Sequence, residues 1–138
     1  MPDPDLAILR EAARTALRFA YAPYSQYPVA CAVLTEDGSI VTGVNMENAS
    51  YGLTLCAERS AVAQAVSRGH RRITAVAVAA LRGGSAPCGA CRQVLAEFAG
   101  PGVPVTFQAP DGAWVVRSLG TLLPEAFSLH ADEHPPVP

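Results

Sequence analysis

The pattern of hydrophobic and polar positions along this 138-residue chain predicts a hairpin followed by alternating helices and strands. Near the amino end, apolar side chains recur at helical spacing, and Asp3 or Asp5 can cap that helix. Two apolar runs then flank an Asp37-Gly38 turn signal, which predicts a β-hairpin. The expected elements are a helix to about residue 20, strands 29–35 and 40–44, a helix 56–67, a strand 73–81, a helix 89–98, strands 103–108 and 114–117, and a short apolar element within 119–127.

This order of elements is typical of an α/β protein, with helices covering a five-strand mixed sheet. We expect one domain over residues 1–138, with a loose tail at about 131–138. The helix over 56–67 is apolar almost all round, which predicts that it is buried. Cysteines begin the two later helices, each of which follows a strand. The cysteines should therefore lie at the carboxyl ends of strands, where open α/β sheets bind their ligands.

Composition and charge narrow the classes of function. The net charge is -2, and the ten basic residues are all arginine and are scattered, so no basic stripe predicts a nucleic-acid groove. No apolar run reaches the roughly 20 residues of a membrane span, and no leader opens the chain. We therefore expect a cytoplasmic protein with no nucleic-acid or membrane partner, and reduced cysteines that bind metal rather than form disulfides.

Three of the four cysteines fall in two short stretches, Cys56-Ala-Glu-Arg59 and Pro87-Cys-Gly-Ala-Cys-Arg92. Three thiolates can hold one zinc ion and leave its fourth position open for water, which distinguishes a catalytic zinc site from a closed structural one. Glu58 is close enough in sequence to carry protons for that water. We therefore expect Cys56, Cys88 and Cys91 to be zinc ligands and Glu58 to be catalytic.

Two other interpretations compete with an open zinc site. A lone C-x-x-C can be a redox pair, or half of a structural zinc site that a fourth ligand would close. Cys31 lies in an apolar run and is expected to be a small buried core residue. His70 lies in a polar turn, and His130 and His134 lie in the proline-rich tail. The absence of an obvious fourth ligand favours the open site.

Polar residues near the zinc stretches suggest further roles. Asn45 follows a predicted strand and can reach a substrate hydroxyl, although asparagine is equally common as a turn former. Three thiolates give a zinc site a net charge of about -1, so we expect at least Arg59 to hydrogen-bond a ligand sulfur. Arg92 is either a similar partner or part of an ordinary salt bridge.

Taken together, these motifs resemble those of the small homotetrameric zinc-dependent cytidine deaminases, and the resemblance covers nearly the whole chain. The stretches that carry it are Ala20-Tyr-Ala-Pro-Tyr-Ser25, Asn45-Met-Glu-Asn-Ala-Ser-Tyr51, the two cysteine stretches and Leu122-Leu-Pro-Glu-Ala-Phe127. The resemblance implies a three-layer fold, one Zn²⁺ per subunit and a homotetramer with active sites shared between subunits. It also implies hydrolytic deamination of cytidine and deoxycytidine by a zinc-bound hydroxide, which releases ammonia in pyrimidine salvage.

The resemblance also assigns roles to residues outside the zinc stretches. Asn45 and Glu47 resemble residues that hold the ribose 3′-hydroxyl. Ala49 and Tyr51 resemble residues offered to a neighbouring subunit's site, and Phe127 resembles an aromatic residue that also reaches across subunits.

Two positions depart from the family pattern. Tyr27 stands where the family usually has phenylalanine against the pyrimidine, so its hydroxyl needs a hydrogen-bond partner. Cys31 replaces a usual glycine or alanine, and packing must accommodate its sulfur.

Three alternatives to a cytidine deaminase remain to be distinguished. A blasticidin-S type deaminase shares the cysteine motifs but is not expected to carry the Asn45-Met-Glu47 pattern. A polynucleotide-editing deaminase would need a basic face that this chain lacks. A zinc-stabilised binding module would bind the metal without catalysis.

Overall fold

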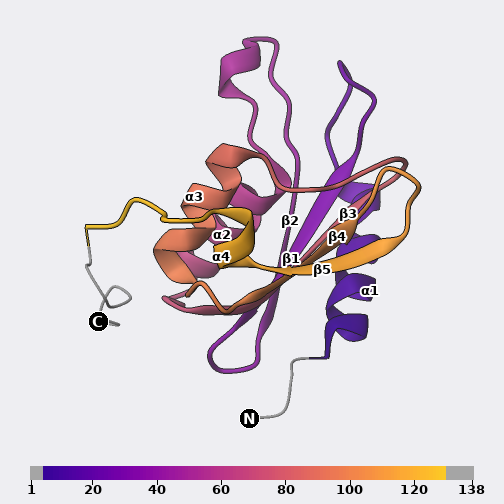
Figure 1. The fold of residues 1–138 in the computed structure, drawn as a ribbon. Coiled ribbons are helices and arrows are strands. Elements are labelled where there is room, and N and C mark those ends of the chain that lie inside the picture. Colours follow the sequence, from indigo (N-terminus) through magenta and orange to yellow (C-terminus); the bar gives the residue numbers. More distant parts are fainter. Residues whose placement is uncertain (1–4, 130–138) are drawn as a thin grey trace.

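A five-stranded sheet with the order β2-β1-β3-β4-β5 forms the centre of the structure (Figure 1). The computed structural model describes residues 5–129, so the alternative cap Asp3 and the expected tail at 131–138 lie outside the described residues. The elements are α1 (Leu6–Ala16), η1 (Leu17–Phe19), β1 (Val29–Thr35), β2 (Ile40–Val44), η2 (Tyr51–Leu53), α2 (Ala57–Ser67), β3 (Ile73–Ala80), α3 (Gly89–Phe98), β4 (Pro104–Gln108), β5 (Trp114–Ser118) and α4 (Leu119–Leu122).

The strand directions bring several loop segments to one edge of the sheet. Strand β1 is antiparallel to both β2 and β3, β3 is parallel to β4, and β4 is antiparallel to β5. The sheet is therefore mixed, as the sequence predicts. The carboxyl ends of β2, β3 and β4 meet the amino end of β1 at the same edge. In Figure 1, the segments 20–28 and 45–55 both project beyond this end of the sheet.

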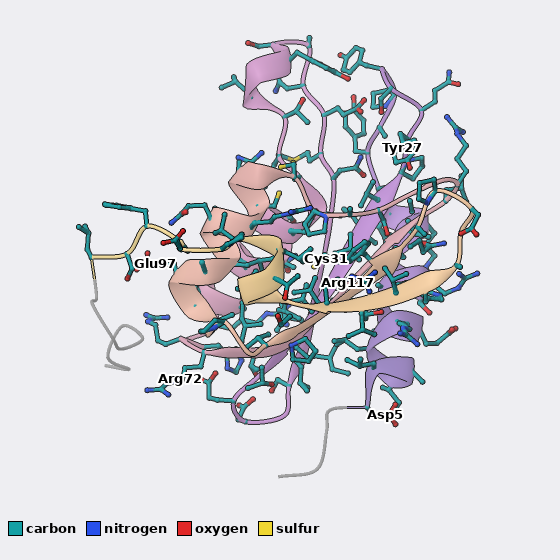
Figure 2. All side chains as sticks on the ribbon, in the orientation of Figure 1. Asp5, Tyr27, Cys31, Arg72, Glu97 and Arg117 are labelled. Carbon is teal, nitrogen blue, oxygen red and sulfur yellow. The ribbon has the colours of Figure 1, made fainter. Side chains whose placement is uncertain are left out.

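Helices cover the two faces of the sheet in the expected three layers (Figure 1). Helix α1 packs on one face, where Leu9 and Ala13 meet the small side chains of β1 and β3, such as Ala32. Helices α2 and α3 pack on the opposite face, where alternate residues of β1, Cys31 and Val33, join their core. This alternation follows from the two-residue repeat of a strand. Cys31 is fully buried there (labelled in Figure 2), so its interpretation as a core residue is confirmed.

The element bounds agree closely with the sequence pattern, with small differences at the ends. Asp5 caps α1 by accepting hydrogen bonds from the amides of Ala7 and Ile8, at 3.1 and 3.2 Å. The short apolar element expected within 119–127 is helical only in α4. None of the helices in residues 5–129 is both long and apolar enough to cross a membrane.

Backbone contact between β2 and α2 fixes the position of the helix that follows Cys56. A Cβ atom on Gly43 would lie 2.2 Å from the backbone nitrogen of Ala61, so only glycine allows this approach. The helix buries its alanines on this side, whereas Ala63 and Gln64 are exposed. The prediction that this helix is buried therefore holds for its face on the sheet and is wrong for its outer face. Alanine is small enough to be tolerated on either side of a helix, so an apolar pattern rich in alanine overstates burial.

Candidate metal centre and adjoining pocket

Three sulfur atoms converge at the starts of two helices. Cys56 is the N-cap of α2, Cys88 is the N-cap of α3, and Cys91 lies in the first turn of α3. Their sulfur atoms all lie within 4.8 Å of one another, and no other group of this kind occurs in residues 5–129. Helix N-termini carry partial positive charge, which favours the thiolate form of these side chains.

The donor set fits a zinc ion. Tetrahedral zinc with Zn–S distances of about 2.3 Å places its sulfurs about 3.8 Å apart, and the Cys88 and Cys91 sulfurs are 3.4 Å apart. No histidine, aspartate or glutamate within the described part of the chain joins the group. The Nδ1 atom of His70 instead lies 3.7 Å from Oε1 of Glu36. His130 and His134 are outside residues 5–129. Three sulfurs without a fourth side chain are the arrangement of an open, catalytic site.

Arg59 supplies positive charge beside the sulfurs. Its Nη2 donates a hydrogen bond to the sulfur of Cys56 at 3.3 Å, so the expected contact with a candidate ligand is present. Its Nε is buried and has no hydrogen-bond partner among residues 5–129, which leaves a second donor available. The Cys91 thiol and, after it, Arg59 hydrogen-bond the Cys56 sulfur, and they lower the pKa of Cys56 to about 5. The same contact, with burial, raises the pKa of Cys91.

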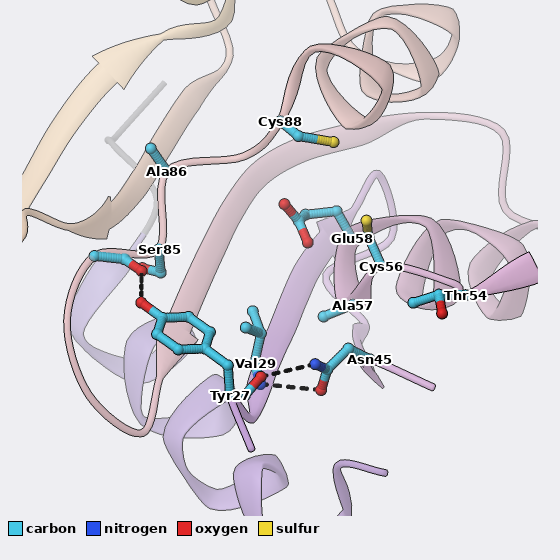
Figure 3. A pocket seen from close by; sticks show the side chains of 11 residues that line it. Tyr27, Val29, Asn45, Thr54, Cys56, Ala57, Glu58, Ser85, Ala86 and Cys88 are labelled. Atoms are coloured by element: carbon cyan, nitrogen blue, oxygen red, sulfur yellow. Dashed lines mark hydrogen bonds between the residues drawn. The ribbon is translucent and has the colours of Figure 1, made fainter. Parts of the chain in front are cut away.

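Glu58 lies on the pocket side of the sulfurs. Figure 3 shows its carboxylate directed into the pocket beside Cys56 and Cys88. Only 5% of the residue is exposed. Burial, and secondarily the charge of Cys56, raise the pKa of the Glu58 carboxyl to about 7. A carboxyl group that titrates near neutral pH can both accept and return a proton.

A pocket opens beside this group at the loop-bearing edge of the sheet. Its volume is about 210 Å³, below the roughly 300–1,000 Å³ of most small-molecule pockets. The lining residues come from four segments of the chain: Tyr27, Val29, Asn45, Thr54, Cys56, Ala57, Glu58, Gly84, Ser85, Ala86 and Cys88. The pocket formed by one chain is therefore smaller than most small-molecule pockets.

Asn45 and Tyr27 form the wall of the pocket opposite the sulfurs (Figure 3). The Asn45 Oδ1 accepts a hydrogen bond from the amide of Val29 at 3.0 Å, and its Nδ2 donates to the carbonyl of Tyr27 at 2.9 Å. The Tyr27 hydroxyl donates to the carbonyl of Gly84. The partner that the sequence requires for this hydroxyl is therefore a backbone carbonyl of the loop before Cys88.

Glu47 is not among the pocket-lining residues, although it is buried. Its Oε1 accepts hydrogen bonds from the amides of Tyr24 and Ser25 at 2.9 and 3.0 Å. The Ser25 hydroxyl donates to Oε2. This hydroxyl is the main cause that lowers the pKa of Glu47. The structure thus gives Glu47 an anchoring role in the 20–28 segment, which the sequence did not indicate.

The remaining predicted contact residues lie on the surface of the chain. Ala49 is exposed, and Tyr51 and Phe127 are 61% and 70% exposed. None of the three lines the pocket of its own chain. Gln93 donates a hydrogen bond from Nε2 to the carbonyl of Phe127 at 3.0 Å, which fixes the segment that carries this aromatic ring.

Arg92 has partners that neither sequence interpretation anticipated. Its Nε donates to the carbonyl of Pro87 at 2.7 Å, and its Nη1 donates to the carbonyl of Leu122 at 2.8 Å. These are backbone groups of the same chain, not a sulfur and not a surface carboxylate. Arg92 therefore holds the backbone before Cys88 against the end of α4.

Sequence reasoning missed the residues that support the pocket from behind. Ser85 donates a hydrogen bond from Oγ to the carbonyl of Val78 at 2.7 Å and accepts one from the amide of Gln108 at 2.8 Å. The available signal was the Gly83-Gly84-Ser85 stretch, whose small residues let the chain turn closely over the ends of β3 and β4.

Comparison with known proteins gives consistent matches. A family model described as "Cytidine and deoxycytidylate deaminase zinc-binding region" matches residues 3–106. A cytidine deaminase of Sporosarcina psychrophila is 49% identical over 110 residues, which cover 79% of this chain and 81% of that protein. A cytidine deaminase of Mycobacterium tuberculosis is 46% identical over 130 residues, which cover 94% of each chain. The crystal structure of cytidine deaminase from Burkholderia pseudomallei superposes with a TM-score of 0.81 at 47% identity and covers 88% of this chain and 98% of that one.

Proposed function

The chain belongs to the zinc-binding cytidine and deoxycytidylate deaminase family, and from this premise we propose how its residues carry out the reaction. The family deaminates cytidine, and the chain is a zinc-dependent hydrolytic deaminase. The observation that carries the proposed assignment of residues is the group of three sulfurs without a fourth side chain, next to a buried Glu58 at the pocket. We propose that Cys56, Cys88 and Cys91 hold one zinc ion and that Glu58 moves the protons.

The proposed mechanism assigns Glu58 two proton transfers. Zinc, when bound, lowers the pKa of water so that it becomes a nucleophile near neutral pH. Glu58 accepts a proton from water and gives it to the pyrimidine N3 as the water oxygen forms a bond to C4. Glu58 then takes the proton of the new C4 hydroxyl and gives it to the amine. The C4–N bond breaks, the C4–O bond becomes the carbonyl, and ammonia leaves, so that cytidine and water become uridine and ammonia. A pKa raised to about 7 suits a group that must exchange protons in both directions.

Tyr27 and Asn45 are the proposed substrate contacts from within the chain. The Tyr27 ring lies on the pocket wall and offers an aromatic surface to the base. Both ends of the Asn45 amide already bind backbone groups, so a ribose hydroxyl would share them. Glu47 is the proposed second ribose contact, and its oxygens retain lone pairs beyond the bonds to Tyr24 and Ser25.

We propose a homotetramer in which neighbouring subunits complete each pocket. The small volume of the pocket and the exposure of Ala49, Tyr51 and Phe127 support this arrangement. Exposed aromatic side chains are costly in water and are enriched at interfaces between proteins. We also propose a cytoplasmic location, because cytosolic thiols stay reduced and are free to bind metal. We propose one domain because the described strands form a single sheet.

A substrate panel tests the proposed activity. Cytidine, deoxycytidine, CMP and blasticidin S are each mixed with zinc-loaded protein, and the pyrimidine ultraviolet spectrum is followed while bound zinc is measured in parallel. We expect turnover of cytidine and deoxycytidine with one zinc per chain. Turnover of blasticidin S alone would favour the other deaminase class, and bound zinc without turnover would favour a binding module.

A further inference from the structure

Three consecutive residues of the loop between β3 and α3 meet the side chain of Tyr27. The Tyr27 hydroxyl donates a hydrogen bond to the carbonyl of Gly84, which Figure 3 shows as a dashed line. The guanidinium of Arg82 lies 5.8 Å from the centroid of the ring. A Cβ atom on Gly83 would lie 2.9 Å from the hydroxyl oxygen. The loop is therefore shaped around a phenol rather than around a plain phenyl ring.

The backbone of Tyr27 is fixed as firmly as its hydroxyl. Its amide donates to Oγ of Ser25 at 3.1 Å, and its carbonyl accepts from Nδ2 of Asn45 at 2.9 Å. The side chain thus spans from the 20–28 segment to the loop at Gly84. Because both ends are held, the side chain cannot move to another χ1 rotamer without breaking the hydrogen bond to Gly84.

The part of the loop that leads to Cys88 has its own anchor. The Ser85 hydroxyl is bound between Val78 and Gln108, and the Ser85 amide donates to the carbonyl of Gln108 at 2.9 Å. Ser85 lies between Gly84 and Cys88 in the chain. Ser85, which β3 and β4 hold in place, therefore separates Gly84, the residue that binds Tyr27, from the sulfur of Cys88.

We propose that the hydroxyl of Tyr27 is a latch that holds one wall of the pocket in its binding shape, which makes Tyr27 a positioning residue for the nucleoside base. The role of the base rests on the proposed function. With the hydrogen bond in place, the ring and the loop are ordered before the substrate arrives. Without it, part of the binding free energy orders them instead, so affinity falls. The Ser85 anchor keeps the chain before Cys88 in place, and Glu58 lies on α2 outside this loop, so the chemical step is unaffected.

Tyr27→Phe tests the latch because it removes one oxygen atom and keeps the ring. The net value of a hydrogen bond predicts that KM for cytidine rises about three- to tenfold, whereas kcat and bound zinc stay at wild-type values. Tyr21→Phe is the matched control, since it makes the same change on a side chain that is 55% exposed, and its KM should not change. An unchanged KM in Tyr27→Phe, or a loss of kcat or zinc, would overturn the proposal.

A thermal-unfolding cycle tests the same latch without catalysis. Gly83→Ala strains a residue with φ +70° and adds a methyl group beside the hydroxyl oxygen, whereas the ring carbons nearest to that methyl would lie at 3.7 and 3.8 Å. Gly83→Ala should therefore lower Tm less in the Tyr27→Phe background than in the wild type. Gly112→Ala has a similar φ of +90° in open space, so its effect should be equal in both backgrounds. Equal losses for Gly83→Ala would contradict the latch, while a protein that shows the coupling but no deamination would contradict only the proposed function.

Discussion

The Nη2 atom of Arg59 donates a hydrogen bond to the sulfur of Cys56 at 3.3 Å. Cys56 is the N-cap of α2, and Arg59 lies in the first turn of the same helix. This pair places a fixed positive charge against a group that carries about one excess negative charge once three thiolates bind a divalent ion. Arg59 also has an unused buried donor, so it can bind more than one sulfur. The contact explains how a site rich in thiolate can keep the acidity that its water requires.

Arg59→Gln should weaken both zinc binding and turnover, because the sulfurs lose the charge that offsets their own. Substitutions of such supporting partners cost about 10- to 100-fold in affinity or activity. Zinc transfer to a competing chelator measures the first effect, and cytidine kinetics at saturating zinc measure the second. Arg68→Gln, at the exposed end of the same helix, serves as the control and should match the wild type. Wild-type values for both measurements in Arg59→Gln would remove this residue from the site.

Glu58→Ala should fold and bind one zinc ion per chain but lose deamination. General acid–base catalysis contributes about 10²- to 10⁴-fold, and no other carboxyl group lines the pocket within the described residues. Single-turnover assays with cytidine, run beside metal analysis and circular dichroism, would separate loss of chemistry from loss of structure. Near-normal turnover in this variant would exclude Glu58 as the proton carrier.

Mixed subunits can test whether pockets are shared. Glu58→Ala removes a group from a subunit's own pocket, whereas Phe127→Ala removes an exposed ring expected to act in a neighbour's pocket. If both variants are inactive alone, their mixture after partial unfolding and refolding should regain a substantial part of the activity, because some pockets then contain two intact contributions. Light scattering of each variant checks that assembly is retained. A mixture no more active than its components would place both groups in one subunit.

Glu47 requires a variant that distinguishes substrate contact from loop anchoring. Glu47→Gln keeps the shape of the side chain but removes the charge, whereas Ser25→Ala removes a hydroxyl that binds Glu47 and leaves the carboxylate intact. We expect Glu47→Gln to raise KM for cytidine by about tenfold or more, since a hydrogen bond to a charged group contributes about 1.5–3 kcal/mol. Ser25→Ala should raise KM much less. Equal increases would mean that Glu47 acts by holding the 20–28 segment.

Asp37 gives the β1–β2 hairpin a pH-dependent contribution to stability. The Thr35 hydroxyl donates to its carboxylate at 2.7 Å and the Ser39 amide donates at 3.0 Å, and together with the Ser39 side chain they lower the pKa of Asp37 to about 2. A lowered pKa stabilises the folded state above the unfolded value of about 3.9, and this contribution is lost as pH falls toward 2. Asp37→Asn should therefore be less stable than the wild type at pH 6, and the gap should narrow between pH 4 and pH 2. Urea unfolding at several pH values measures this gap, and a constant gap would contradict the assignment.

The strands and the metal cluster are the parts that the sequence predicts most fully. Residues 29–35 and 40–44 form strands with the predicted bounds, because an Asp-Gly turn fixes where each run ends. The convergence of Cys56 with Cys88 follows from the fact that both open helices after strands that share an edge. The turn residues and the cysteines at the helix starts each determine the structure of a few neighbouring residues, so the sequence pattern is enough to predict them.

Contacts between distant segments could not be predicted in the same way. Nothing near Gly43 in the sequence indicates that Ala61 lies against it, since that contact depends on how a helix settles on a strand. The partners of Arg92 are carbonyl groups, which every residue possesses, so the side chain gives no hint of which ones it binds. The hydrogen bonds from Ser25 to Glu47 likewise depend on the folding back of the 45–55 segment.

The cysteines that begin α2 and α3 occupy N-cap positions, but their sulfurs do not accept a capping hydrogen bond from the backbone amides of the first turn. Serine or aspartate caps a helix better, by about 1 kcal/mol relative to poor capping residues. Sequence optimisation for thermal stability of the metal-free chain would therefore tend to replace Cys56 and Cys88, and would yield a robust protein with no catalytic power. Screens of variants of this enzyme should score turnover alongside melting temperature, because at these two positions the two properties select opposite residues.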